Sequence, residues 1–190
     1  MRAILRVMIV LGAAFVASAA DNPKIVIKTE LGDIVAEICQ DKAPVTAGNF
    51  LRYVDAGLYN DTTFFRTVKM DNQPNNAVKI EVIQGAQLPE DKEFPPIKLE
   101  RTSVTGVTHV DGALSMARDG PDTARSSFSI CIHDQPALDF GGRRNPDGQG
   151  FAAFGRVVSG MDVVRAIQLR PAEGQTLRPA VKIITIKKLE

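Results

Sequence analysis

The chain has 190 residues, of which 44% are hydrophobic and 24% are charged, proportions typical of a single globular domain. Its 23 basic and 22 acidic residues nearly cancel, which argues against a nucleic-acid-binding protein or one held to anionic membranes by charge. A chain of this length can bury a sizeable core, so the fold requires neither a metal nor a disulfide.

The first twenty residues differ in composition from the rest. Two arginines near the start are followed by the ten-residue apolar run Val7–Val16 and then by the small residues Ala17–Ala20. This order is typical of a secretory signal peptide, and the run is shorter than the roughly 20 apolar residues that span a bilayer. The alternative is a short buried helix. We therefore expect a cleaved signal peptide at 1–20 and one domain at 21–190, exported to the periplasm or secreted, with no membrane attachment after cleavage.

The first third of this domain predicts three strands and a helix. Lys24–Lys28 has alternating apolar residues, and Ile34–Cys39 is expected to be the return strand of a hairpin. A helix is expected to begin at Pro44, because proline suits the first helical position, and to end near Gly57. Thr63–Val68 is rich in β-formers and predicts the next strand.

The remainder predicts further short strands and one more helix. Lys69–Ala77 is polar and turn-forming, Val78–Ile83 alternates as a strand does, and Met161–Leu169 has apolar residues at helical spacing. Phe140–Gly150 is glycine-rich and predicts a surface loop. Other strands are expected at Gly112–Met116, Phe128–Ile132, Ala152–Val158 and Val181–Leu189. Because strands and helices do not alternate, the pattern favours an all-β barrel of seven or eight strands, capped by two helices, over a parallel α/β sheet.

The sequence contains no recognisable metal site or nucleophile motif. Neither His109 nor His133 has a close second ligand, and paired-cysteine spacing is lacking, so no metal is expected. No Gly-x-Ser-x-Gly elbow occurs, although a Ser-His-Asp set stays open because such triads are recognised by geometry. Cys39 and Cys131 allow a disulfide or two unpaired thiols. Their apolar surroundings favour thiols.

The most informative segment is Thr62–Arg66, which places one arginine near the end of an aromatic strand. Taken alone, Arg66 would predict only a surface ion pair. Six other segments accompany it along the chain. Asp41–Pro44 precedes it, and five segments come after it: Ile83–Gly85, Ser115–Arg118, Ser126–Ile130, Gly150–Val157 and Phe154–Val164. In this order the motifs resemble the cyclophilins, a family of peptidyl-prolyl cis/trans isomerases, over essentially the whole mature chain. The resemblance implies a closed eight-stranded antiparallel barrel capped by two helices.

The resemblance also implies a set of site residues and no cofactor. Arg66 would be the catalytic group, donating hydrogen bonds toward the prolyl amide, and Gln84 would help to hold the arginine and the substrate backbone. The resemblance further implies substrate contacts from Phe64, Val82, Ala117, Arg118, Ser127, Ser129, Leu138 and Phe151.

The expected proline pocket departs from the family pattern. Ser129 replaces a second aromatic residue, Ser127 a glutamine, and Ala137 a tryptophan or other aromatic residue. Arg118 replaces an asparagine, which predicts a preference for acidic residues beside the proline, and Lys69–Val78 has the length of an inserted loop. Because burying an apolar side chain contributes roughly 1.5–3 kcal/mol, these losses predict weaker or redirected turnover.

Two functions remain open. The first is a monomeric prolyl isomerase that assists the folding of exported proteins and acts on proline-containing peptides and unfolded exported chains. The second is a non-catalytic peptide-binding or chaperone module on the same barrel. A barrel that carries a small ligand would leave Arg66 and Gln84 without a role.

Overall fold

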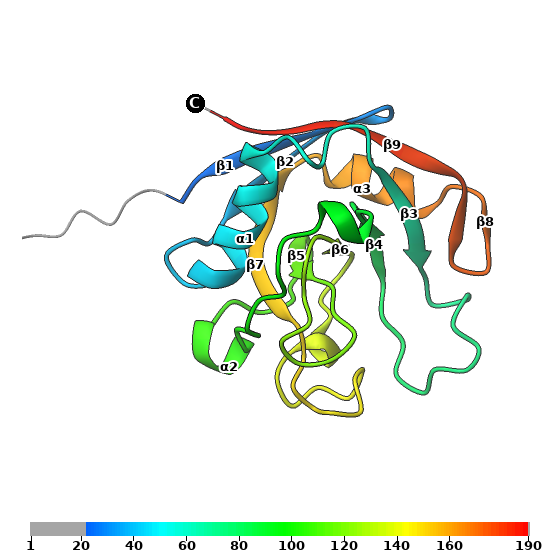
Figure 1. Cartoon of the computed structure of the whole chain (residues 1–190). Coiled ribbons are helices and arrows are strands. Elements are labelled where there is room, and N and C mark those ends of the chain that lie inside the picture. Colours follow the sequence, from blue (N-terminus) through cyan, green and yellow to red (C-terminus); the bar gives the residue numbers. More distant parts are fainter. Residues whose placement is uncertain (1–21, 190) are drawn as a thin grey trace, which may run out of the picture.

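The computed structural model describes residues 22–189, so the expected signal peptide at 1–20 lies outside the described residues. Nine antiparallel strands within this range share one sheet in the order β1-β2-β7-β5-β6-β4-β3-β9-β8, and β1 also pairs with β9. Eight strands therefore close into a barrel, and the two-residue β8 extends from β9 (Figure 1). The strands are β1 Lys24–Thr29, β2 Gly32–Ile38, β3 Thr63–Val68, β4 Val82–Gly85, β5 Ala113–Met116, β6 Phe128–Cys131, β7 Ala152–Ser159, β8 Ala172–Glu173 and β9 Thr176–Lys188.

Two helices pack apolar faces onto the barrel, as predicted. Helix α1 (Pro44–Asp55) begins at the expected proline and contacts β7 and β9, whereas α3 (Met161–Gln168) contacts β2, β3 and β4. A third, single-turn helix, α2 (Thr102–Thr105), was not predicted. Its four residues are too few to show helical periodicity, and threonine is a poor helix former.

The barrel separates an inner core from an outer apolar cluster. Phe50, Phe64, Phe128 and Phe154 lie in the inner core, where Phe50 packs against Phe128 and Phe154 with ring centroids 5.3 and 5.1 Å apart. The outer cluster consists of Val68, Ile80, Val82, Ala113, Cys131 and Leu138. Since successive side chains of a strand point to opposite faces, the two clusters determine which residues of β4, β5 and β6 face outward.

The boundaries of two strands differ from the prediction. Strand β4 runs from Val82 to Gly85 rather than from Val78 to Ile83. The buried side chain of Gln73 explains the difference, because it donates to the Ile80 carbonyl (2.8 Å) and accepts from the Ile80 amide (3.3 Å). Strand β9 begins at Thr176, five residues before the predicted Val181. The prediction missed this part of the strand because Pro179 interrupts the alternating pattern.

The preference for unpaired cysteines is confirmed within residues 22–189. Cys39 and Cys131 are both free thiols, and Cys131 is buried in β6. No helix of this part of the chain is long and apolar enough to cross a membrane.

Candidate active site

A row of four side chains crosses four neighbouring strands of the barrel. The strand register places Arg66 opposite Gln84, Gln84 opposite Ser129, and Ser129 opposite Ser115. The register shifts between Phe64 and Arg66, and such a bulge re-aims the side chains beside it. As a result both Phe65 and Arg66 line an outward-facing groove of about 890 Å³, together with the other three residues of the row.

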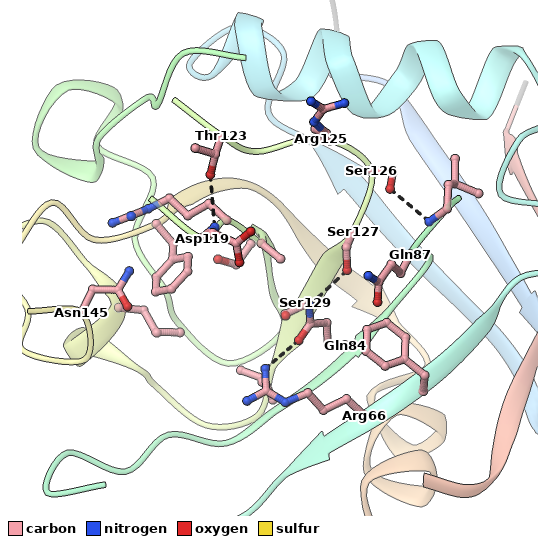
Figure 2. Close-up of a pocket in the computed structure, with 18 of the residues that line it drawn as sticks. Arg66, Gln84, Gln87, Asp119, Thr123, Arg125, Ser126, Ser127, Ser129 and Asn145 are labelled. Atoms are coloured by element: carbon pink, nitrogen blue, oxygen red, sulfur yellow. Dashed lines mark hydrogen bonds between the residues drawn. The ribbon is translucent and has the colours of Figure 1, made fainter. Parts of the chain in front are cut away.

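The guanidinium of Arg66 is held by two neutral amides. Its Nη1 donates to Gln84 Oε1 at 2.8 Å (Figure 2), and its Nε and Nη2 donate to Gln175 Oε1 at 3.0 and 2.6 Å. Arginine has five N–H groups, so two remain for a ligand in the groove. Burial, and secondarily the nearby Arg144, lower the pKa of Arg66 from its ordinary value, and no carboxylate of the described residues pairs with it. The result is a rigidly held cation whose charge is not neutralised by the protein.

Gln84 is itself fixed in one orientation. Its Nε2 donates to Ser127 Oγ at 3.1 Å, and Ser127 in turn donates to the Gly85 carbonyl at 3.0 Å. These contacts leave Gln84 Oε1 facing the arginine. Ser127, predicted as a substrate contact, therefore lines the groove and also orients Gln84.

Gln175 is a site residue that the sequence analysis missed. It lies in the turn between β8 and β9, 109 residues from Arg66, and its Nε2 also donates to the Asn72 carbonyl at 3.2 Å. Asn72 belongs to the predicted inserted loop, so Gln175 connects that loop to the guanidinium. No motif in the sequence relates the two positions, and only the pairing of β3 with β9 brings them together.

The apolar wall of the groove contains three of the predicted substrate contacts. Val82, Leu138 and Phe151 line it, with Ile80 from the segment after the inserted loop. Ser129 lies on the floor, where the family resemblance implies an aromatic ring. Ala117 also lines the groove, as predicted.

The prediction for Phe64 is wrong, and the ion pair of Arg118 bears on its expected preference for acidic substrates. Phe64 has no exposed surface and lies in the inner core, 6.1 Å from Phe128 between ring centroids, so it does not reach the groove; its neighbour Phe65 does. Arg118 lines the groove, but its Nη1 and Nη2 are bound by the two carboxylate oxygens of Asp147 at 2.8 and 3.0 Å. Its charge is therefore already matched, which removes the reason to expect that it recognises acidic substrates.

A buried Ser-His-Asp network supports the wall beside Ser129. His109 Nδ1 lies 2.7 Å from Asp139 Oδ1, and its Nε2 lies 2.9 Å from Ser115 Oγ. Because His109 is 1% exposed and Ser115 is 3% exposed, this hydroxyl is not presented as a nucleophile. The network instead ties β5 to the segment that carries Leu138. No group of three or more metal-binding side chains occurs among residues 22–189.

The groove continues well beyond the arginine. Figure 2 shows Arg66 on one side and Thr123 and Arg125 on the other, with Gln87 between them. Glu93 also lines this extension, where it accepts a hydrogen bond from Ser126 and approaches Arg125 at 3.9 Å. The groove is thus long enough, and carries enough polar groups, for several residues of an extended peptide.

Comparison with known proteins agrees with this geometry. Residues 24–189 match the family described as cyclophilin type peptidyl-prolyl cis-trans isomerase/CLD. A peptidyl-prolyl cis-trans isomerase of Acinetobacter baylyi is 35% identical over 193 residues, which cover 96% of this chain and 94% of that protein. Peptidyl-prolyl cis-trans isomerase B of Escherichia coli is 38% identical over 141 residues, which cover 74% of this chain and 80% of that protein.

A solved structure shares the fold. The crystal structure of a cyclophilin type peptidyl-prolyl cis-trans isomerase from Cryptosporidium parvum superposes with a TM-score of 0.72, at 21% identity, over 89% of this chain and 98% of that one. The family match covers nearly the whole described domain, and the closed barrel agrees with it. The chain belongs to the family of cyclophilin-type peptidyl-prolyl cis-trans isomerases.

Proposed function

We propose that the protein catalyses the cis/trans isomerisation of X–Pro bonds in exported proteins, as a monomer, with Arg66 as the catalytic group. The observation that carries this proposal is the position of the Arg66 guanidinium. It is held by Gln84 and Gln175 at the side of an apolar-walled groove and keeps two N–H groups unused.

The chemistry follows from the electronic structure of the amide bond. Resonance keeps the X–Pro amide planar and gives a rotation barrier of about 18–20 kcal/mol. In the twisted transition state the nitrogen lone pair is no longer delocalised, so a hydrogen-bond donor aimed at that nitrogen binds the transition state more tightly than the ground state. The guanidinium is suited to this because it stays charged and its amide partners restrict its orientation.

The remaining groove residues bind and orient the peptide. Val82, Leu138 and Phe151 would receive the proline ring, and Gln84 would hold the backbone next to it. An acceleration from about 0.01 to about 1,000 per second requires about 7 kcal/mol at 1.36 kcal/mol per tenfold, so several oriented contacts must contribute. With Ser129 in place of an aromatic side chain, we expect turnover below that of a fully aromatic pocket.

Substitution of Arg66 tests the proposal directly. In a protease-coupled assay on an X–Pro peptide, Arg66→Ala should lower kcat/KM by about 100-fold or more, the loss typical of removing one preorganised donor. The matched control is Arg170→Ala, which removes an exposed arginine outside the groove and should leave the rate unchanged.

The alternative function gives a different result. A peptide-binding module without catalysis would show no rate above buffer for the wild-type protein while still binding the peptide. Equal rates for wild type and Arg66→Ala would remove Arg66 from the mechanism.

A further inference from the structure

The charges along the groove are not evenly paired. Its lining contains four arginines and three carboxylates. Arg118 is matched by Asp147, and Arg125 lies 3.9 Å from Glu93. Arg66 and Arg144, in contrast, have no carboxylate of the described residues within 4.0 Å. The groove therefore contains two cations without an anionic partner, and they lie close enough for Arg144 to lower the pKa of Arg66.

Arg144 is held in place by its backbone and its side chain. Its amide donates to the Ala137 carbonyl at 3.1 Å, and its Nη1 donates to the Val78 carbonyl at 2.7 Å. The turn before it is tightly packed, because a Cβ on Gly142 would clash with the Ala137 oxygen. Arg144 is thus fixed between the inserted loop and the segment that carries Leu138, on the rim of the apolar wall.

Most of the hydrogen-bonding capacity of Arg144 is unused. One of its five N–H groups is bound, and the side chain is partly removed from solvent, which lowers its pKa. A partly dehydrated cation beside a second one is costly, because no protein anion offsets the repulsion and water screens it only in part. An incoming carboxylate would relieve both effects.

On this basis we propose that Arg144 selects substrates that carry an acidic side chain directly beside the isomerised proline. The inference rests on the proposed isomerase function and adds a substrate class to it. It assigns to Arg144 the preference that the sequence suggested for Arg118, whose charge Asp147 already satisfies. The two arginines then have different roles: Arg66 faces the imide nitrogen of the substrate, and Arg144 faces the substrate side chain next to the proline.

The test compares matched peptides that differ by one charge. Each pair consists of a Glu peptide and a Gln peptide, with the varied residue immediately before the proline in one pair and immediately after it in the other. Their isomerisation is measured by NMR exchange spectroscopy, which needs no coupling protease. For the wild-type protein at low salt we expect kcat/KM to be about three- to fivefold higher for the Glu peptide at one of the two positions, in line with a partly exposed ion pair. High salt should reduce this ratio because exposed charges are screened.

Arg144→Gln and Arg143→Gln have equal net charge and together locate the effect, with Arg144→Lys as the charge-retaining variant. Arg144→Gln should bring the Glu/Gln ratio close to one, and Arg144→Lys should restore part of it. Arg143→Gln removes the adjacent exposed arginine, which does not line the groove, and should keep the wild-type ratio.

The possible outcomes separate this inference from the proposed function. Measurable turnover with equal rates for Glu and Gln peptides at both positions overturns the role of Arg144 and leaves the isomerase intact. Loss of the preference in Arg143→Gln as well would assign it to general electrostatics and also overturn the inference. If no peptide is turned over, the isomerase proposal fails, and NMR titration of the same peptides decides whether Arg144 still gives tighter binding of the Glu member.

Discussion

At the scale of single residues, the arrangement around Arg66 explains how an arginine can act in a groove that is open to solvent. A free arginine side chain has many rotamers, and ordering it costs free energy. Here Gln84, from β4, and Gln175, from the turn between β8 and β9, bind three of its N–H groups. Both partners are neutral, so they fix the position of the charge without cancelling it.

The role of Gln175 predicts a specific kinetic change. Gln175→Ala should lower kcat by about tenfold while KM stays within about twofold, because hydrogen bonds to charged groups contribute roughly 1.5–3 kcal/mol and the loss falls on the transition state. Gln175→Glu keeps an acceptor oxygen but adds a carboxylate that would neutralise the Arg66 charge, so its kcat should fall as well. Steady-state kinetics on one X–Pro peptide measures both variants.

The control for this prediction is a neighbour in the same hairpin. Glu173→Gln changes an exposed residue whose nearest partner, Arg178, is 3.7 Å away, and it should behave as wild type. An unchanged kcat in Gln175→Ala, or a rise in KM alone, would contradict a positioning role.

Arg66 and Gln84 could be predicted from the sequence because their motifs are local. Gln175 and Arg144 could not, since their importance depends on which loops meet at the groove. The acidic preference expected of Arg118 loses its basis for the same reason: the sequence shows the arginine, but the carboxylate of Asp147 that pairs with it lies 29 residues away. Long-range partners decide whether a cation is available to a ligand.

At the scale of elements, the segment from Lys69 to Glu81, which contains the predicted inserted loop, is an ordered part of the site. Gln73 is 1% exposed, and its amide binds the carbonyls of Lys69 and Ile80 and the amide of Ile80. It acts in place of a neighbouring strand, which is why the alternating Val78–Ile83 pattern does not extend β4. An alternating pattern correctly predicts which side chains are exposed and which are buried, but it does not show which group forms hydrogen bonds with the backbone amides and carbonyls.

Removal of the Gln73 side chain should therefore loosen this loop. We expect Gln73→Ala to lower the free energy of unfolding by about 1–3 kcal/mol, because it leaves buried backbone groups at Ile80 without partners. Urea denaturation measures the change. Asn75→Ala, an exposed position in the same loop, is the matched control, and equal stability of the two variants would show that Gln73 does not hold the loop.

At the scale of the whole molecule, the described residues form one closed domain, and the export part of the proposed function depends on the residues before it. Their charged, apolar and small residues follow the order of a cleaved signal. We expect the exported protein to begin at Asp21, which intact-mass measurement of protein isolated from the periplasm or the medium would show. A mass that includes the first twenty residues would contradict cleavage and favour another role for them.

The closure of the barrel also determines where an attached partner would lie. Strand β1 pairs with β9, and Leu189 donates to the Lys24 carbonyl at 2.8 Å, so both described ends leave the barrel together (Figure 1). Around the eight-stranded ring β1 stands diametrically opposite β6, the strand at the centre of the groove. A tether, a fusion domain or a solid support joined at either end would therefore leave the peptide-binding face unobstructed.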